Sequence, residues 1–127
     1  MSVLPRKFGY SRKLRMRGRN AFDAAFAARA RRDVGPVACV AKPNGDGFCR
    51  FGISIGKRVG NAPKRNRIKR LLREAFRLSQ HDWPVGYDIV CIVRPHPTLT
   101  LAEYQRLLFS AIRGLHRTWQ KRDSVQT

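Results

Sequence analysis

Residues 64–78 join a dense run of cations to an apolar stripe with helical spacing. The apolar side chains recur as they would along one face of a helix: Ile68, Leu71, Leu72, Ala75 and Phe76. The opposite side is polar or cationic: Asn66, Lys69, Arg70, Arg73 and Arg77. Such a helix has to bury one face against a core, and it presents the other face to a partner. A polyanion is the partner that this charge favours.

The whole chain has the same imbalance of charge. It contains 127 residues, with 27 Lys and Arg against 8 Asp and Glu, and its formal net charge is +19. The length suits one domain, and the composition is typical of nucleic-acid-binding proteins. The longest apolar run, residues 89–93, is too short to span a bilayer. No apolar segment follows the Arg-rich start, so we expect no signal peptide and a cytoplasmic protein.

We expect a single RNA-binding domain over residues 1–122 and a disordered tail over residues 123–127. Residues 1–19 form a basic arm that contains no acid. Few apolar residues lie in this arm, so we expect it to be mobile when free and to order on a polyanion.

The residue types that perform chemistry are scattered. Cys39, Cys49 and Cys91 lie in apolar, strand-like segments without zinc-ligand spacing, so we expect buried, reduced thiols. The histidines, His81, His96 and His116, have no companion at ligand spacing, and we expect them to be solvated. No two acids are spaced to hold two metal ions or to form an acid–base pair. The residues therefore predict neither a catalytic nor a metal-binding side chain.

The first half of the chain predicts one helix and two strands. Asn20 is a good N-cap for a helix that runs to about Arg31. A strand over residues 37–42 is followed by a hairpin turn at residues 43–47 and a partner strand over residues 48–55. Alternate residues of that partner strand form a polar, open face: Phe48, Arg50, Gly52 and Ser54.

The second half predicts a parallel crossover and a long final helix. Asn61 caps the basic helix, and Tyr87–Val93 is apolar on both faces, as in a central strand. Thr100 and Glu103 form a capping box for the last helix. Its exposed side carries four cations: Arg106, Arg113, Arg117 and Lys121. The fold class is α+β, a two-layer sandwich in the order helix, strand, strand, helix, strand, helix, with room for one extra short strand. The default for its crossover is right-handed.

Phe22 and Phe26 leave two interpretations open. Either ring alone is expected to belong to the core. A short helix could instead cover a sheet edge with one ring and leave the other half-exposed, as a platform on which bases stack. No helix-turn-helix, zinc finger or heptad pattern is present, so recognition by shape, backbone and stacking favours RNA over DNA.

Phe51 to Arg77 closely resembles the central motif of the bacterial ribonuclease P protein subunit. Arg65-Asn66-Arg67 stands where that family has its arginine-asparagine-arginine motif. The similarity covers about residues 12–118. The resemblance implies a ribosomal-protein-like sandwich with a left-handed crossover. It also implies a small cofactor of a large catalytic RNA, which uses bound Mg²⁺ to cut the 5′ leader from precursor tRNA.

The resemblance further assigns residues to two RNA partners. We call the residues expected to contact the catalytic RNA the RNA-subunit set: Lys57, Arg58, Lys64, Arg65, Asn66, Arg67, Lys69, Arg70 and Arg73. We call those expected to contact the single-stranded leader the leader set: Phe22, Phe26, Arg50 and Ser54. The protein is expected to act as a monomer in a 1:1 complex with the RNA, away from membranes, with Mg²⁺ held mainly by the RNA.

One departure from the family and two other functions remain open. The family often supplies a further aromatic from the strand after the first helix, and residues 38–41 offer none. Leader stacking is then weaker or uses Phe48. A small basic ribosomal or RNA-chaperone protein would also fit the charge and fold class. A self-sufficient nuclease is disfavoured by the scattered acids.

Overall fold

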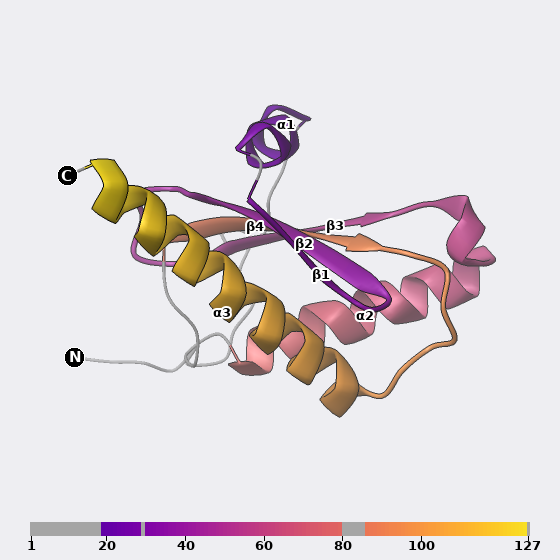
Figure 1. The fold of residues 1–127 in the computed structure, drawn as a ribbon. Helices are drawn as coiled ribbons and strands as arrows, with labels where there is room; N and C mark the ends of the chain where they lie inside the picture. The colour runs from indigo at the N-terminus through magenta and orange to yellow at the C-terminus, as the bar shows by residue number, and fades with distance from the viewer. Residues whose placement is uncertain (1–18, 29, 80–85, 127) are drawn as a thin grey trace, which may run out of the picture.

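Helices cover both faces of one mixed sheet in the computed structural model, which describes residues 19–28, 30–79 and 86–126 (Figure 1). The elements in chain order are α1 (Arg19–Ala27), β1 (Arg31–Val34), β2 (Val37–Pro43), β3 (Arg50–Ile55), the 3₁₀ turn η2 (Lys57–Val59), α2 (Ala62–Ser79), β4 (Tyr87–Val93) and α3 (Leu101–Gln126). The helix α3 extends beyond residue 122, where we expected the domain to end. The basic arm of residues 1–18 lies outside the described residues.

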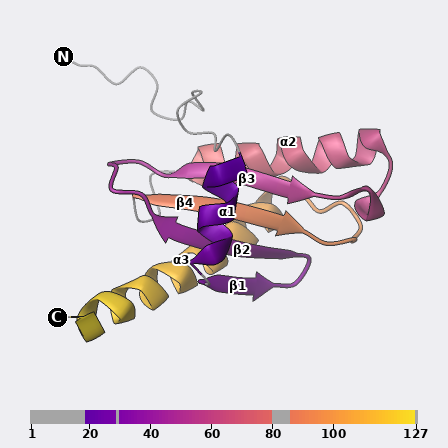
Figure 2. The ribbon, with the colours of Figure 1, turned by 90° about the horizontal axis from the view of Figure 1, so that it is seen from above.

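The strand β4 lies inside the sheet, as its two apolar faces predict. The strand order is β1-β2-β4-β3, with β4 antiparallel to β2 and parallel to β3. Figures 1 and 2 show α1 above the sheet and α2 and α3 below it. Both faces of β4 are therefore covered, which explains why its residues are almost all buried.

The predicted hairpin between β2 and β3 is wrong, because β4 lies between these strands. The turn residue Asn44 bonds to the start of β4 instead. Its backbone N–H donates to the Gly86 carbonyl at 2.8 Å, and its Nδ2 donates to Asp88 Oδ1 at 3.0 Å. Gly86 has a φ of +89°, and an added Cβ would lie 3.0 Å from the Asp46 carbonyl oxygen. Residues 44–49 thus cross the end of β4 rather than closing a two-stranded hairpin.

The first helix is shorter than predicted, because residues 31–34 form the extra short strand β1 rather than a helix end. A tight turn at Gly35, with a φ of +68°, reverses the chain into β2. Pairing with β2 provides hydrogen-bond partners for the backbone N–H and C=O groups of residues 31–34, which would lack them if the chain simply ended a helix at Arg31.

The β3-α2-β4 crossover is left-handed. Seen from the α1 side in Figure 2, β3 and β4 run in the same direction while α2 passes behind the sheet. The right-handed default is wrong here, and the expectation from the family resemblance is confirmed. The apolar residues Phe51, Ile53 and Ile55 of β3 face the lower core, so α2 has to cover that face; a right-handed connection would place it above the sheet.

The core has a large lower part and a small upper part. Below the sheet, α2 and α3 pack on alternate residues of β2, β3 and β4. The ring of Phe76 stacks on that of Phe51, with centroids 4.6 Å apart. Above it, Ala25 of α1 packs with Val40 and Val90. Cys39, Cys49 and Cys91 are buried, as predicted, and none of the three forms a disulfide. No helix in the described part of the chain is both long and apolar enough to cross a membrane.

The histidine prediction is wrong for the two described histidines, while His81 lies outside the described residues. His96 is half-buried, with Nδ1 2.7 Å from the Arg94 carbonyl and Nε2 2.7 Å from the Tyr104 hydroxyl. His116 Nδ1 lies 2.8 Å from the Tyr87 hydroxyl. Both rings contact tyrosines near helix α3, which a scan for ligand spacing does not detect.

The capping box at the start of α3 is confirmed. The backbone N–H of Thr100 donates to Glu103 Oε1 at 3.0 Å, and the backbone N–H of Glu103 donates to Thr100 Oγ1 at 3.2 Å. The hydrogen bonds that the backbone N–H and the hydroxyl of Thr100 donate to this carboxylate are the main reason that the pKa of Glu103 lies below its ordinary value.

Phe76→Ala should strongly destabilise the fold, because it removes the ring that stacks on Phe51 beneath the sheet. We expect the free energy of unfolding in urea to fall by about 3–5 kcal/mol. The matched control is Arg70→Ala, an exposed position on the same helix, which should change it by no more than about 0.5 kcal/mol. Equal losses for the two variants would contradict the packing described here.

Candidate nucleic-acid interface

Helix α2 is fixed by one face, as its sequence predicts. Ile68, Leu72, Ala75 and Phe76 are buried in the core below the sheet. The first turn is capped by Asn61, whose Oδ1 accepts the backbone N–H of Lys64 at 3.0 Å. With one face held in the core, the cationic face of the helix cannot rotate inward.

The loop before α2 is held in a defined shape. Val59 is buried and anchors η2, while Lys57 and Arg58 in the same turn are exposed. The Nε of Arg65 donates to the Gly60 carbonyl at 3.1 Å. Gly60 has a φ of +157°, a backbone conformation that residues with a side chain rarely adopt, so this position favours glycine. Loop and helix therefore present their cations as one continuous band.

The structure places the whole RNA-subunit set on this band. Lys57, Arg58, Asn66, Arg67 and Arg70 are exposed, and the remaining members are half-buried: Lys64, Arg65, Lys69 and Arg73. Within the described residues, none of these side chains forms an ion pair with an acid. Their positive charge is therefore available to an external polyanion.

Arg77, at the last turn of α2, differs from its neighbours. Its guanidinium pairs with Glu74, with Nη2 2.5 Å from Oε2, and this hydrogen bond holds the pKa of Glu74 below its ordinary value. The sequence placed Arg77 on the cationic side, but Glu74 compensates its charge.

The residues of β3 divide between the two faces of the sheet, as their alternation predicts. Phe51, Ile53 and Ile55 join the lower core. Arg50 and Ser54 therefore lie on the upper face, where α1 packs. Ser54 is exposed and Arg50 is half-buried.

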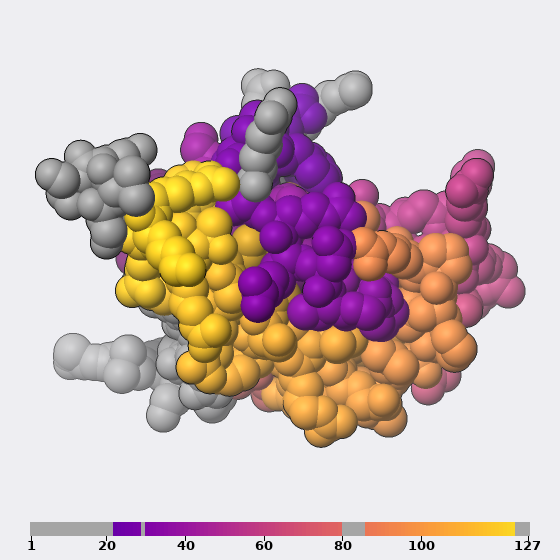
Figure 3. Space-filling model, viewed as in Figure 1, coloured from indigo at the N-terminus to yellow at the C-terminus, as the bar shows by residue number. Residues whose placement is uncertain are grey.

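Phe22 and Phe26 have different environments on α1. Phe22 is half-buried and packs with Ala25, Val40 and Val90. Phe26 is 41% exposed. In the space-filling view, α1 rises above the sheet (Figure 3). This arrangement matches the second interpretation of the pair, with one ring packed and one ring open.

Arg50 is held by an acid that sequence reasoning did not single out. Its Nε and Nη2 donate to the two carboxylate oxygens of Asp88 at 2.7 and 2.6 Å, and Asn44 donates to the same carboxylate at 3.0 Å. The hydrogen bond to Asp88 raises the pKa of Arg50. An acid inside an otherwise apolar strand is the signal that could have revealed this pair, because a buried charge requires a partner.

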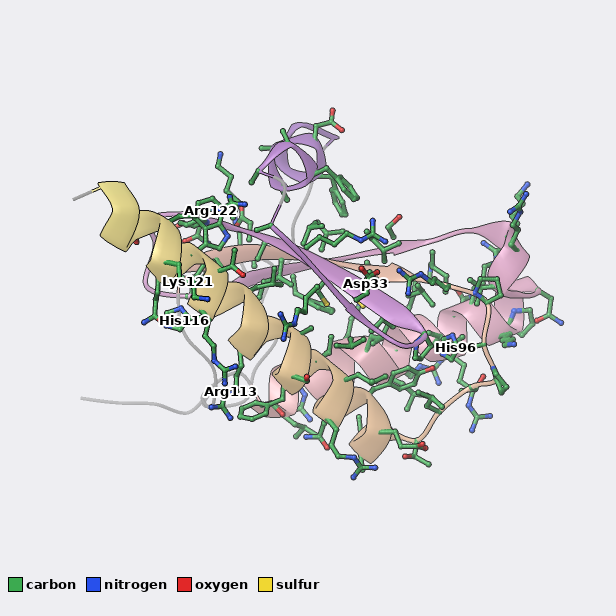
Figure 4. All side chains as sticks on the ribbon, viewed as in Figure 1. Asp33, His96, Arg113, His116, Lys121 and Arg122 are labelled. Carbon is green, nitrogen blue, oxygen red and sulfur yellow. The ribbon has the colours of Figure 1, made fainter. Side chains whose placement is uncertain are left out.

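The far end of α3 holds α1 in place. Arg122 Nη1 donates to the Ala28 carbonyl at 2.8 Å, just after α1, and its guanidinium lies 4.6 Å from the ring centroid of Trp119. The indole Nε1 of Trp119 donates to the Ala41 carbonyl at 2.9 Å. Figure 4 shows Arg122 beside the sheet at the end of α3. The placement of α1, which carries Phe22 and Phe26, therefore depends in part on the contact from Arg122.

Strand β3 connects the two candidate binding surfaces. One is the cationic band on η2 and α2, and the other is the upper face of the sheet, which bears the leader set. The band follows β3 directly in the chain and lies on the lower side of the sheet, while Arg50 and Ser54 lie on its upper side. No three potential metal ligands among His, Cys, Asp and Glu come together within the described ranges.

Comparison with known proteins identifies the family. The sequence model of the family described as Ribonuclease P matches residues 10–119. The ribonuclease P protein component of Brevibacillus brevis is 53% identical over 55 residues, which cover 43% of this chain and 44% of that protein. The match thus spans less than half the length of this curated relative.

Solved structures agree with the sequence match. The RNase P protein from Thermotoga maritima superposes with a TM-score of 0.71 at 27% identity, covering 77% of this chain and 94% of that one. The RNase P protein of Staphylococcus aureus gives 0.69 at 26% identity, covering 79% and 93%. On the family match, the shared fold and the cationic band, this chain belongs to the Ribonuclease P family of protein components.

Proposed function

We propose that this protein is the RNA-binding subunit of ribonuclease P and promotes removal of the 5′ leader from precursor tRNA by a catalytic RNA. The observation that carries the proposal is the band of uncompensated cations on η2 and α2, in a chain of this family. This band binds the RNA subunit. The upper face of the sheet binds the leader.

The band is suited to a folded RNA backbone. Exposed Arg67 and Arg70 reach outward from a helix that the core holds rigid, so little ordering is needed when phosphates bind. Arginine donates two parallel hydrogen bonds to a phosphate, which makes it well suited to this contact.

The leader face is suited to a single strand. The open ring of Phe26 offers a stacking surface, and exposed Ser54 offers a hydroxyl. Asp88 fixes the orientation of Arg50 through Nε and Nη2, which leaves Nη1 to reach a phosphate.

The reaction itself is assigned to the RNA. Mg²⁺, held mainly by the RNA, would neutralise charge at the reacting phosphate. The protein contributes binding and orientation, as a monomer with one RNA subunit. A cytoplasmic location is supported by its three buried cysteines, none of which forms a disulfide.

Arg67→Gln should weaken binding to the RNA subunit. Each lost phosphate contact reduces the slope of log affinity against log salt by roughly 0.7–0.9. Filter binding over a salt series measures both quantities. Arg31→Gln is the control, because Arg31 lies on β1 and is paired with Asp33. A loss that is equal in both variants would show that only total charge matters.

Phe26→Ala should weaken binding of precursor tRNA by the holoenzyme by roughly 1–3 kcal/mol and leave mature tRNA unaffected, because one stacked base is lost. Phe22→Ala should in addition lower the free energy of unfolding, because Phe22 packs on the sheet. Equilibrium binding of both tRNA forms and urea unfolding provide the measurements. An equal loss for precursor and mature tRNA would remove Phe26 from the leader site.

Sequencing the RNA that co-purifies with the protein from its own cells tests the function as a whole. Enrichment of a single ribonuclease P RNA is the expected result. Enrichment of ribosomal RNA would favour a ribosomal or chaperone role. Cleavage of precursor tRNA by the purified protein without RNA would revive a self-sufficient nuclease.

A further inference from the structure

We propose that the binding surface for the catalytic RNA continues from α2 onto the outer face of α3, where Arg106, Arg113, Arg117 and Phe109 contact a further segment of the same RNA. The inference rests on the proposed function and extends it to residues outside the RNA-subunit set. It is carried by the placement of cations on α3, by an exposed ring among them, and by the junction between α2 and α3.

The cations of α3 form a stripe opposite its buried side. Leu108, Ala111 and Leu115 are buried against the sheet. Arg106, Arg113 and Arg117 are exposed, and helical periodicity places all three within a narrow sector on the other side. At 1.5 Å per residue the stripe is roughly 16 Å long, which is enough for several phosphates.

These charges are not compensated within the described part of the chain. None of the three arginines forms an ion pair with an acid there. Glu103, one turn before Arg106, is hydrogen-bonded to Thr100 in the capping box. Arg106 contributes only weakly to the lowered pKa of Glu103, after the hydrogen bonds from Thr100. The stripe therefore attracts anions from outside the protein.

An exposed aromatic ring lies beside the stripe. Phe109 is 36% exposed, and the guanidinium carbon of Arg113 lies 5.2 Å from its ring centroid. Among the described residues, only Phe26 is a more exposed large apolar side chain. An aromatic ring next to arginines is a surface on which an unpaired base stacks while phosphates bind the guanidinium groups.

The stripe adjoins the end of α2, the helix that carries the band. Gln105 Nε2 donates to Ser79 Oγ at 3.2 Å, so the start of α3 touches the end of α2. Phe109 follows Gln105 by one helical turn and lies on the same side of α3, toward α2. Figure 4 shows Arg113 on the side of α3 away from the sheet.

Both helices cover the same face of the sheet, so one large RNA is the occupant that fits. Figure 1 shows α2 and α3 side by side below the strands, with α1 on the other side. A folded RNA seated on the outer side of α2 meets α3 without crossing the sheet. The leader, on the α1 side, would have to pass around an edge.

The double variant Arg113→Gln/Arg117→Gln tests the stripe. We expect weaker binding to the RNA subunit alone, with a salt slope lower by roughly 1.4–1.8, the sum of two contacts. The matched control is Arg31→Gln/Lys42→Gln, which removes two exposed cations from the strands. Phe109→Ala should weaken binding roughly tenfold at an unchanged slope.

A photo-crosslinking probe locates the contact directly. Ser110 is exposed and lies within the stripe, and the native cysteines are buried, so Ser110→Cys adds one selectively labelled thiol. We expect crosslinks from this position to the RNA subunit in the assembled holoenzyme. Asn66→Cys on α2 is the positive control.

The outcomes separate this inference from the function on which it rests. If Arg67→Gln weakens binding to the RNA subunit but the α3 double variant does not, and Ser110→Cys gives no crosslink to that RNA, the inference is overturned and the function stands. If the α3 variant weakens only precursor tRNA, the stripe serves another RNA and the inference is likewise overturned. If neither variant affects the RNA subunit, the proposed function also fails.

Discussion

Burial of one side of α2 beneath the sheet is the interaction on which the rest of the structure depends. Ile68, Leu72 and Phe76 join the core of β3 and β4, and Phe76 stacks on Phe51. Because the core fixes the rotation of the helix, the cations of the other side point outward, and within the described residues Arg77 is the one among them that pairs with an acid. Hydrophobic packing thus sets the geometry of the electrostatic surface.

The two faces of the sheet have different amounts of apolar contact, and we relate this difference to the two binding roles proposed for them. The lower face has a large core that makes α2 and α3 rigid supports. The upper face has only a small cluster around Ala25, Val40 and Val90, so α1 leaves Phe26 open. Under the proposed function, a rigid lower face suits the RNA subunit, while an upper face that the described residues cover only sparsely suits a leader strand that is released after cleavage.

Local sequence patterns predicted the elements better than their connections. The stripe of α2, the two-faced apolar β4 and the capping box at Thr100 were readable because each depends on residues close in sequence. The true path of residues 43–47 could not be predicted from local sequence, which indicated a hairpin turn. Asn44 bonds to Gly86 and Asp88, which are far along the chain. The left-handed crossover came from family resemblance alone.

In the candidate site, too, the features that depend on neighbouring residues were predictable and those that depend on distant residues were not. The band on η2 and α2 could be predicted from spacing and charge. The partner of Arg50 could not, because Asp88 reaches it only after β4 has paired with β3. His96 and His116 were misassigned for a similar reason, since their tyrosine partners come from other elements.

Near the end of α3, Arg122 donates to the Ala28 carbonyl just after α1, and Trp119 donates to the Ala41 carbonyl of β2, although both lie far along the chain from these partners. The orientation of Phe26 is therefore not a local property of its own helix. Under the proposed function, a change at Arg122 would shift the helix that carries Phe26 and would alter leader binding without touching any nucleotide.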